Sequence, residues 1–285
     1  MTRDSSHPFA GEITITQDHV RIFQEGSKTY FNSTKFFPEE KRVLVTALYG
    51  FVRVADTFVD SIPQDVQGFQ QFTQEFRTAR ENRQLSGNPI IDEFLKLSYQ
   101  LDFPDTWADA FLYSMELDLT KNTYNTLDET LEYIYGSAEV IGLFMNRVMG
   151  IDPKFDHQAQ MLGRSMQYIN FLRDVHEDHS LGRRYIPLEE TDLKGLTEED
   201  YRQDPEEFNR FMRRELERFV SWQKEAETAF PVIPKKLRIP IKTASDMYLW
   251  TARKISHNPS VVFHTQVKPP KYRIMLQGIL NGLLA

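Results

Sequence analysis

Apolar residues recur at intervals of three and four along most of the chain, which is the period of an amphipathic α-helix. The clearest example follows Pro38 and covers residues 39–60. Alternation of apolar and polar residues, which is typical of a strand, is convincing only at residues 13–16. Further helices are expected at 126–149, 156–178, 205–230 and 242–255. The pattern therefore predicts an all-α fold.

Local signals set the expected helix boundaries. Thr126 with Glu129 forms a capping-box pattern, and Pro205 follows Asp204 at a helix start. Pro231, Pro234 and Pro240 are expected to keep the last helix from starting before Lys242. Residues 62–105 contain glycines and prolines that indicate loops between shorter helices. Since no repeat or change of composition marks a boundary, we expect one domain over residues 1–285, with residues 1–18 as the flexible part.

Two carboxylates lie on the apolar helix at residues 39–60. The spacing of four places Asp56 and Asp60 on one face, with Arg53 one turn earlier. The surrounding residues are apolar nearly all round, so we expect this helix to be buried. Buried carboxylates are costly unless they are paired or bound to a cation, and one arginine would hardly neutralise both.

A second acidic column lies on the helix at residues 156–178. Asn170, Asp174 and Asp178 follow one another at spacings of four, with Arg173 adjacent. All three offer oxygen atoms, which magnesium prefers, and this ion typically takes one or two carboxylates plus water and phosphate. One acidic pair alone is usually a solvated helix face. Two columns on apolar helices, facing each other, would suit a metal–diphosphate cluster.

Composition excludes several other functions. The net charge of −7 argues against nucleic acid as a partner, and the absence of cysteine excludes disulfides and thiolate chemistry. No phosphate-binding glycine loop, nucleophile elbow or dinucleotide fingerprint is present. No apolar run reaches the length of a membrane span, so we expect a cytoplasmic protein.

The motifs resemble those of the squalene/phytoene synthase family. The strongest match is residues 167–178 with the Asn170, Asp174 and Asp178 column, followed by Arg184 and Tyr185. Tyr49, Arg53, Asp56 and Asp60 resemble the first signature of the family, and residues 26–31 resemble a segment that helps to hold a diphosphate. The likeness extends over most of the chain.

The resemblance implies an all-α isoprenoid synthase bundle with a central active-site cavity. It also implies head-to-head condensation of two allylic prenyl diphosphates through a cyclopropyl diphosphate. The implied cofactor is Mg²⁺, with Mn²⁺ as a substitute. NADPH is needed only if the product is squalene.

The resemblance also assigns roles to residues. Asp56, Asp60, Asn170, Asp174 and Asp178 are the expected metal ligands, and the four aspartates are expected to be catalytic together with Tyr133. Tyrosines are expected to wall a dry cavity and to serve proton removal. The expected substrate-binding residues are Ser27, Lys28, Tyr49, Arg53, Gln167, Asn170, Arg173, Arg184, Tyr185 and Tyr248.

Three positions depart from the pattern of the family. Thr57 replaces a second aspartate, which should tune the local charge. Glu139 stands where many relatives have glycine, so it either polarises or shortens the prenyl tunnel or faces an arginine. Gln266 stands where relatives often have a basic residue, a role that Lys268 or Lys271 would take over.

Three functions stay open at this point. The leading one is the joining of two geranylgeranyl diphosphates to phytoene, and its rival is squalene or dehydrosqualene synthesis from farnesyl diphosphate. Substrate length would depend on Ile141, Phe144, Met145 and Leu162. The third is a non-catalytic assembly factor, which the persistence of both acidic pairs disfavours. Because the product is insoluble in water, we expect peripheral contact with a membrane, for which residues 272–284 are apolar enough. The oligomeric state is unknown.

Overall fold

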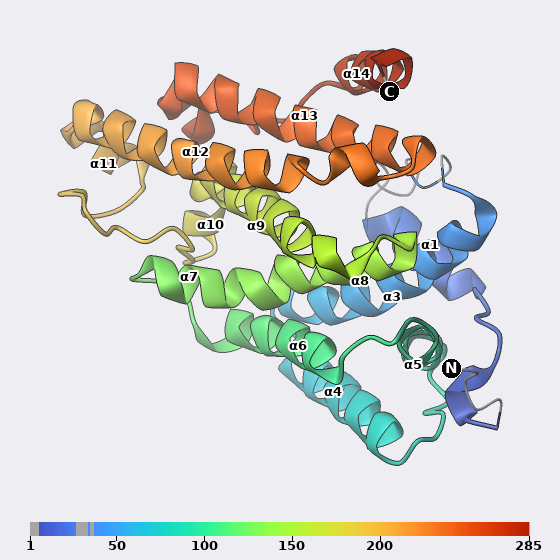
Figure 1. Cartoon of the computed structure of the whole chain (residues 1–285). Helices are drawn as coiled ribbons and strands as arrows, with labels where there is room; N and C mark the ends of the chain where they lie inside the picture. Colours follow the sequence, from blue (N-terminus) through green and yellow to red (C-terminus); the bar gives the residue numbers. More distant parts are fainter. Residues whose placement is uncertain (1–5, 27–33, 35–36, 285) are drawn as a thin grey trace. The chain divides into compact units, whose positions relative to one another are not determined.

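The computed structural model describes residues 6–26, 34 and 37–284, and these residues fold almost entirely as helices (Figure 1). Among them, the only pairing of the β type is an isolated parallel bridge between Thr123 and Arg184. The prediction of an all-α fold is confirmed. Contacts divide the chain into two compact units, residues 1–119 with 144–153 and residues 120–143 with 154–285. The expectations of a single domain and of a flexible start stay predictions.

The first unit is built around one long helix, α3. This helix packs against α1, α4 and α5. Asp65 caps α4 by accepting a hydrogen bond from the Gly68 backbone, and Asn88 caps α5 in the same way through Ile90. The bounds are α1 Gln17–Gly26, α3 Glu39–Asp60, α4 Val66–Glu81, α5 Pro89–Leu101 and α6 Asp105–Thr120.

Phenylalanine rings fill the core of the first unit. Phe51 of α3 is fully buried and stacks on Phe94 of α5, with ring centroids 4.0 Å apart. Phe144 extends the same cluster, since its ring lies 5.7 Å from that of Phe94 and 4.7 Å from that of Phe103. This packing fixes the inner face of α3, so the side that carries Asp56 and Asp60 faces away from the cluster.

The second unit is built around α9, which packs against α7, α12 and α13. In Figure 1, α12 and α13 run alongside each other next to α9. The helices of this unit are α7 Leu127–Ile134, α9 Asp156–Arg173, α10 Val175–Ser180, α11 Glu198–Gln203, α12 Pro205–Glu227, α13 Lys235–His257 and α14 Lys271–Leu284. Helix α8, Val140–Met149, begins in the second unit and ends in the first.

Two glycines allow the helices of the second unit to approach closely. A Cβ atom on Gly163 of α9 would lie 2.3 Å from the Ala138 carbonyl oxygen, and one on Gly142 would lie 2.2 Å from that of Ala159. Both contacts are with backbone atoms, which cannot move aside as a flexible side chain would. The glycines therefore set how closely α9 packs against the segment that carries Ala138 and Gly142.

The predicted helices are mostly confirmed, but two of them are not continuous. The helix expected at residues 126–149 is interrupted by a π-helical turn, Tyr135–Glu139, between α7 and α8. The helix expected at residues 156–178 breaks at Asp174, whose backbone angles are φ −102° and ψ 16°. Hydrogen bonds from the Asp174 amide to the Asn170 carbonyl and from the Asp178 amide to the Asp174 carbonyl still continue the helical progression. The acidic column is thus kinked rather than straight.

Two other predictions are wrong. Pro240 does not end a loop but lies inside α13, where it removes one backbone bond and the packing against α9 and α12 maintains the helix. Residues 13–16 form no strand. Instead, the Thr14 amide donates to the Glu93 carboxylate at 2.7 Å, so a side chain satisfies the backbone there.

None of the described helices is both long enough and apolar enough to cross a membrane.

Candidate active site

The first acidic segment occupies one side of α3. Tyr49, Arg53, Asp56 and Asp60 follow one another at spacings of four, three and four, so they form a single stripe. The prediction that this helix is buried all round is wrong, because Asp60 is exposed and Asp56 is half-buried. Two carboxylates beside one arginine keep this side of the helix hydrated.

Other carboxylates lie near Asp56. Arg53 pairs with Asp56 in a hydrogen-bonded ion pair. Burial nevertheless raises the pKa of Asp56 to about 7, helped by the charges of Asp60 and Asp118 and opposed by Arg53. A cation bound beside Asp56 would favour its charged form, which burial and the neighbouring carboxylates disfavour.

The end of α1 lies against this stripe. Phe23 of α1 stacks on the Tyr49 ring at 3.9 Å, and burial raises the pKa of Tyr49. A Cβ atom on Gly26 would lie 2.5 Å from the Tyr49 hydroxyl oxygen and 2.9 Å from Arg53 Nε. Only a glycine fits there without displacing both side chains. Ser27 and Lys28, which follow it, lie outside the described residues.

Asp118 is a residue that sequence reasoning missed. It lies on α6 and is 5% exposed, and its charge contributes to the raised pKa of Asp56. Gln64 connects the two helices by donating to the backbone carbonyls of Asp118 and Val59 at 2.9 and 2.8 Å. The sequence signal that could have identified Asp118 is an acidic residue at a position of α6 where an apolar residue would be expected.

In the second segment, Asn170 presents an unpaired oxygen. Its Oδ1 atom is buried and has no hydrogen-bond partner among the described residues. Buried polar atoms normally have a partner, so an unpaired one requires an explanation. An amide oxygen one helical turn from the Asp174 carboxylate is a suitable ligand for a hard cation.

Arg173 lies at the centre of the charges in this segment. Its guanidinium holds Asp174 with two hydrogen bonds, of which the bond from Nε is 2.8 Å long. Burial lowers the pKa of Arg173, but the bonds to Asp174 and the charges of Tyr248 and Glu177 outweigh burial and raise it. The structure therefore places Tyr248 of α13 close to Arg173. Gln167 lies one turn before Asn170 and is half-buried.

Asp178 lines a small pocket of about 20 Å³ with Arg184 and Tyr185, together with Arg183 and His179. Arg184 does not extend freely into it. Its guanidinium donates to the backbone carbonyls of Ile186 at 2.7 Å and Tyr124 at 3.1 Å, and burial lowers its pKa. Arg184 thus connects the backbone at Tyr124 with the backbone at Ile186 through hydrogen bonds. Phosphate binding by this residue stays a prediction.

Aromatic rings gather around Tyr133 and Tyr185. Both are buried, with ring centroids 5.1 Å apart. Phe171 of α9 stacks on Tyr185 at 4.3 Å, and Tyr124 lies 5.5 Å from it. The π faces of such a group suit contact with an apolar or cationic carbon chain.

Of the three residues that depart from the pattern of the family, Glu139 and Gln266 each have hydrogen-bond partners. Glu139 lies in the π-helical turn and pairs with Arg164 of α9 at 2.6 Å, so the alternative of a partner arginine is confirmed. Gln266 donates to Glu177 at 3.0 Å and accepts from Lys268 at 2.9 Å.

Thr57, the third departure, is exposed, and its hydroxyl donates to the Arg53 carbonyl at 2.7 Å.

The oxygen ligands of the two acidic segments fit a divalent cation whose coordination shell is completed by a substrate phosphate. Among the residues that the structure describes, no three histidine, aspartate or glutamate side chains are placed to hold a metal ion by themselves. Magnesium usually binds through one or two carboxylates and keeps water and phosphate as its other ligands. Asp56 with Asp60, and Asn170 with Asp174, meet that requirement within their own units.

The structure thus brings together the predicted residues in three groups. Tyr49, Arg53, Asp56 and Asp60 share one stripe of α3. Asn170, Arg173, Asp174 and Tyr248 form the second group, and Asp178, Arg184, Tyr185 and Tyr133 form the third. That the two acidic segments face each other stays a prediction.

Comparison with known proteins gives a consistent result. The family model described as squalene/phytoene synthase matches residues 23–273. The 15-cis-phytoene synthase of Enterobacter agglomerans is 29% identical over 242 residues, covering 81% of this chain and 82% of its own. The phytoene synthase of Arthrospira platensis is 28% identical, and the match covers 96% of this chain and 92% of its own.

Solved structures show the same fold. A squalene synthase from Alicyclobacillus acidocaldarius aligns with a TM-score of 0.73 at 19% identity, covering 84% of this chain and 93% of its own. A dehydrosqualene synthase aligns with a TM-score of 0.75 at 20% identity, covering 94% of this chain and 96% of its own. Since one family model spans most of the chain, the protein belongs to the squalene/phytoene synthase family of prenyltransferases.

Proposed function

We propose that the protein joins two molecules of geranylgeranyl diphosphate head to head to give phytoene, with Mg²⁺ and without a redox cofactor. The substrate choice is supported by the phytoene synthases that match more than four fifths of the chain. The structural observation that supports the chemistry best is the buried, unpaired Asn170 oxygen beside the Asp174 carboxylate, because it leaves a ligand for a hard cation.

The first step is the ionisation of one substrate. Its C1–O bond breaks and the electron pair leaves with the diphosphate. Bound Mg²⁺, or Mn²⁺ in its place, would supply positive charge to the leaving oxygens. Asp56 and Asp60 in one segment, and Asn170, Asp174 and Asp178 in the other, would hold that cation. Arg53 and Arg173 would donate to diphosphate oxygens directly.

The second step is carbon–carbon bond formation. The double bond of the other substrate attacks the allylic carbocation, and loss of a proton closes the cyclopropane. Tyr133, Tyr185 and Phe171 would offer π faces to the cation and keep water away from it. The Tyr133 hydroxyl is our candidate for accepting the proton, directly or through the departing diphosphate.

The third step ionises the cyclopropyl diphosphate, and rearrangement with loss of a second proton gives the linear hydrocarbon. A synthase that makes squalene would instead need hydride from NADPH. Squalene or dehydrosqualene formation from farnesyl diphosphate is the alternative function, and the family to which the solved structures belong includes both activities. Persistence of both acidic pairs disfavours a non-catalytic assembly factor.

The test is to incubate the purified chain with farnesyl or geranylgeranyl diphosphate and Mg²⁺, with and without NADPH, and to analyse the hydrocarbons. We expect a C40 product from geranylgeranyl diphosphate alone, and none when the metal is chelated. A C30 product would overturn the substrate assignment and keep the reaction. Failure of every combination would favour the non-catalytic alternative.

We further propose that the protein works in the cytoplasm with peripheral contact with a membrane, because a C40 hydrocarbon must leave for an apolar phase.

A further inference from the structure

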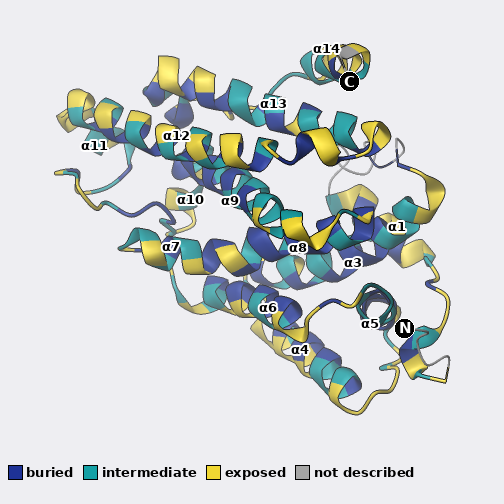
Figure 2. Ribbon diagram, viewed as in Figure 1, coloured by how far each residue is buried: buried dark blue, intermediate teal, exposed yellow. Residues whose placement is uncertain are grey.

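The last helix, α14, exposes its apolar side. Six large apolar side chains of α14 are between 42% and 78% exposed. They are Tyr272, Met275, Leu276, Ile279, Leu280 and Leu283. Their spacing of three, one, three, one and three places them on one continuous face. Figure 2 shows exposed residues on α14. A helix on the surface of a protein in water normally turns its apolar side toward the core and its polar side toward the solvent.

The polar side of α14 is held against α13. Asn281 is 3% exposed and donates to Asp246 at 2.8 Å and to the Thr243 hydroxyl at 3.1 Å. Gln277, one turn earlier, also donates to Asp246 at 2.8 Å. Asp246 is in turn paired with Lys242 at 2.9 Å. These hydrogen bonds fix the rotation of α14, so the apolar face is a stable feature of the fold.

The surroundings of this face are basic. Helix α14 contains no acidic residue, and Lys271 and Arg273 lie in its first turn, shortly after Lys268. Arg273 and Arg253 line a hollow of about 120 Å³ between α13 and α14, and Arg273 lies over the Trp250 ring at 5.5 Å. This charge contrasts with the net charge of −7 of the whole chain. It is complementary to anionic headgroups.

The size of the face decides between a lipid surface and a second protein. The apolar face consists of six side chains of one helix. A stable protein interface involves about 20–30 residues on each partner. A bilayer has no such minimum, since an in-plane helix inserts only its apolar face among the acyl chains while basic residues contact headgroups.

We propose that α14 is an interfacial helix that docks the protein on an anionic bilayer through this apolar face. Lys268, Lys271, Arg253 and Arg273 contact the headgroups. The inference deepens the membrane contact of the proposed function by assigning its surface, but vesicle binding tests it without any turnover.

The experiment measures sedimentation of the full chain with vesicles of phosphatidylglycerol and phosphatidylcholine, and with phosphatidylcholine alone. We expect binding to the mixed vesicles that Leu276→Asp/Ile279→Asp lowers by at least about tenfold. Lys271→Gln/Arg273→Gln should lower binding to the anionic vesicles by about tenfold as well. A Leu276→Ser/Ile279→Ser variant repeats the first test with smaller side chains, and circular dichroism verifies folding.

A matched control places two aspartates on exposed apolar positions elsewhere. Leu85→Asp/Val232→Asp replaces side chains that are 46% and 51% exposed, and it should bind as the unmodified chain does. Equal binding of the α14 variants, equal binding to both kinds of vesicle, or a dimer in solution that the α14 variants dissociate would each overturn the proposal. Turnover in detergent solution reports the proposed reaction separately, and the Leu276 and Ile279 variants should retain it.

Discussion

At the scale of single residues, Asp56 shows why the first segment is suited to a cation. It forms an ion pair with Arg53, while Asp60 and Asp118 add negative charge nearby. Burial, together with the charges of Asp60 and Asp118, raises the pKa of Asp56 to about 7 although Arg53 opposes the shift. Removal of the charge of Asp56 would therefore ease the local repulsion while removing a ligand, so stability and activity should respond in opposite directions.

We predict that Asp56→Asn and Asp174→Asn each lower kcat by at least about 100-fold, as expected when a group that stabilises developing charge is removed. Because the side chains keep their size and Asp56 is not fully paired, the free energy of unfolding of Asp56→Asn should not fall. Initial rates with geranylgeranyl diphosphate and Mg²⁺ measure the effect. Glu40→Gln, an exposed acid in the first turn of the same helix, is the control and should keep full activity. Near-normal activity of either aspartate variant would refute the metal assignment.

His19 of α1 is a second residue whose surroundings predict a measurable effect. It is fully buried, its Nδ1 accepts from the Thr16 amide, and its Nε2 has no hydrogen-bond partner among the described residues. Burial lowers its pKa from 6.5, although Glu93 and Asp18 oppose the shift. The folded protein thus binds a proton less readily than the unfolded chain does. The stability that this provides is present above pH 6.5 and is lost as the pH falls.

We predict that the titration of His19 lowers the free energy of unfolding by up to about 1.4 kcal/mol between pH 7.5 and pH 5.5, while Asp56, whose pKa is raised to about 7, acts in the opposite direction. The contribution of His19 is measured by urea unfolding of the unmodified chain and of His19→Phe at both values of pH. It is the difference between the two proteins in how much the free energy of unfolding changes with pH. As the pH is lowered from 7.5 to 5.5, the variant should lose less stability, or gain more, than the unmodified chain does. An identical dependence on pH in both proteins would show that folding does not lower the pKa of His19.

At the scale of elements, the close approach of α9 to the π-helical turn depends on glycine. We predict that Gly163→Ala destabilises the protein by about 1–3 kcal/mol, because the new methyl group would overlap the Ala138 carbonyl. Activity should fall as well, since α9 carries Asn170 and Arg173. Gly278→Ala is the matched control: its Cβ atom would lie 3.8 Å from the nearest atom, and alanine favours a helix by about 0.5–1 kcal/mol. Equal effects of the two substitutions would contradict the packing argument.

The sequence predicts the helices well and their interruptions poorly. The period of apolar residues locates α3 and α12, but it averages over several turns. It therefore misses one extra residue in the turn at Tyr135–Glu139 and the single non-helical residue Asp174. Pro240 was misread for a related reason, since tertiary packing of α13 outweighs the loss of one backbone hydrogen bond.

Sequence spacing also groups most of the candidate site. It brings together residues of one helix, such as Arg53 with Asp56, because helical geometry fixes them. It does not show that Asp118 of another helix adds charge to Asp56, or that Glu129 and two backbone carbonyls surround Arg184. Contacts between elements depend on packing, which local periodicity does not encode.

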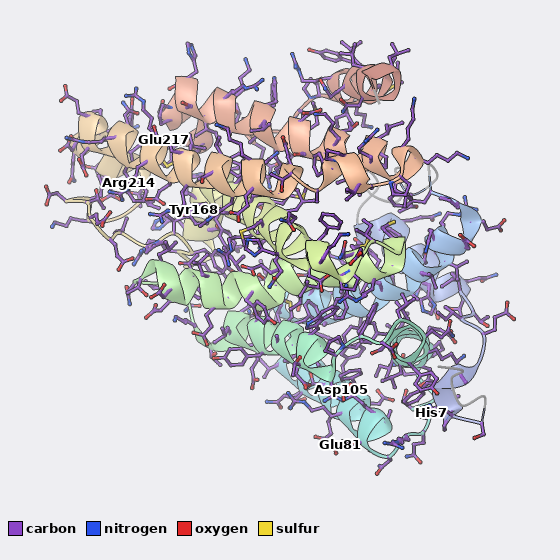
Figure 3. All side chains as sticks on the ribbon, viewed as in Figure 1. His7, Glu81, Asp105, Tyr168, Arg214 and Glu217 are labelled. Carbon is purple, nitrogen blue, oxygen red and sulfur yellow. The ribbon has the colours of Figure 1, made fainter. Side chains whose placement is uncertain are left out.

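Away from the candidate site, a buried network ties α9 to α12. The Tyr168 hydroxyl donates to Glu215, which also pairs with Arg214 and Arg218 at 2.9 and 3.0 Å. Figure 3 shows Tyr168 where α9 passes α12, the helix that carries Arg214. Burial and the charge of Glu215 raise the pKa of Tyr168 far above its ordinary value. The network leaves the opposite face of α9 to Asn170 and Arg173 and holds their helix in place.

At the scale of the whole molecule, the proposed function makes the two acidic segments parts of one reaction although they belong to different units. Their common ligand would be a metal–diphosphate complex, so a ligand that engages both should stabilise the whole chain. Binding to the folded state raises stability by RT ln(1 + [L]/Kd), which is about 2.7 kcal/mol at a hundredfold excess over Kd. A chain of this size should then melt about 5 °C higher.

We predict that Mg²⁺ with a non-hydrolysable geranylgeranyl diphosphate analogue raises the melting temperature by this amount, and that neither component does so alone. Differential scanning fluorimetry with and without a chelator measures the shift. Asp56→Asn and Asp174→Asn should each abolish it, because each removes a ligand from one of the two units. If Asp174→Asn removes the shift and Asp56→Asn does not, the complex binds to the second unit alone, and a reaction that uses both segments would be refuted. Glu40→Gln should show the full shift, which separates the loss of a ligand from the loss of a negative charge.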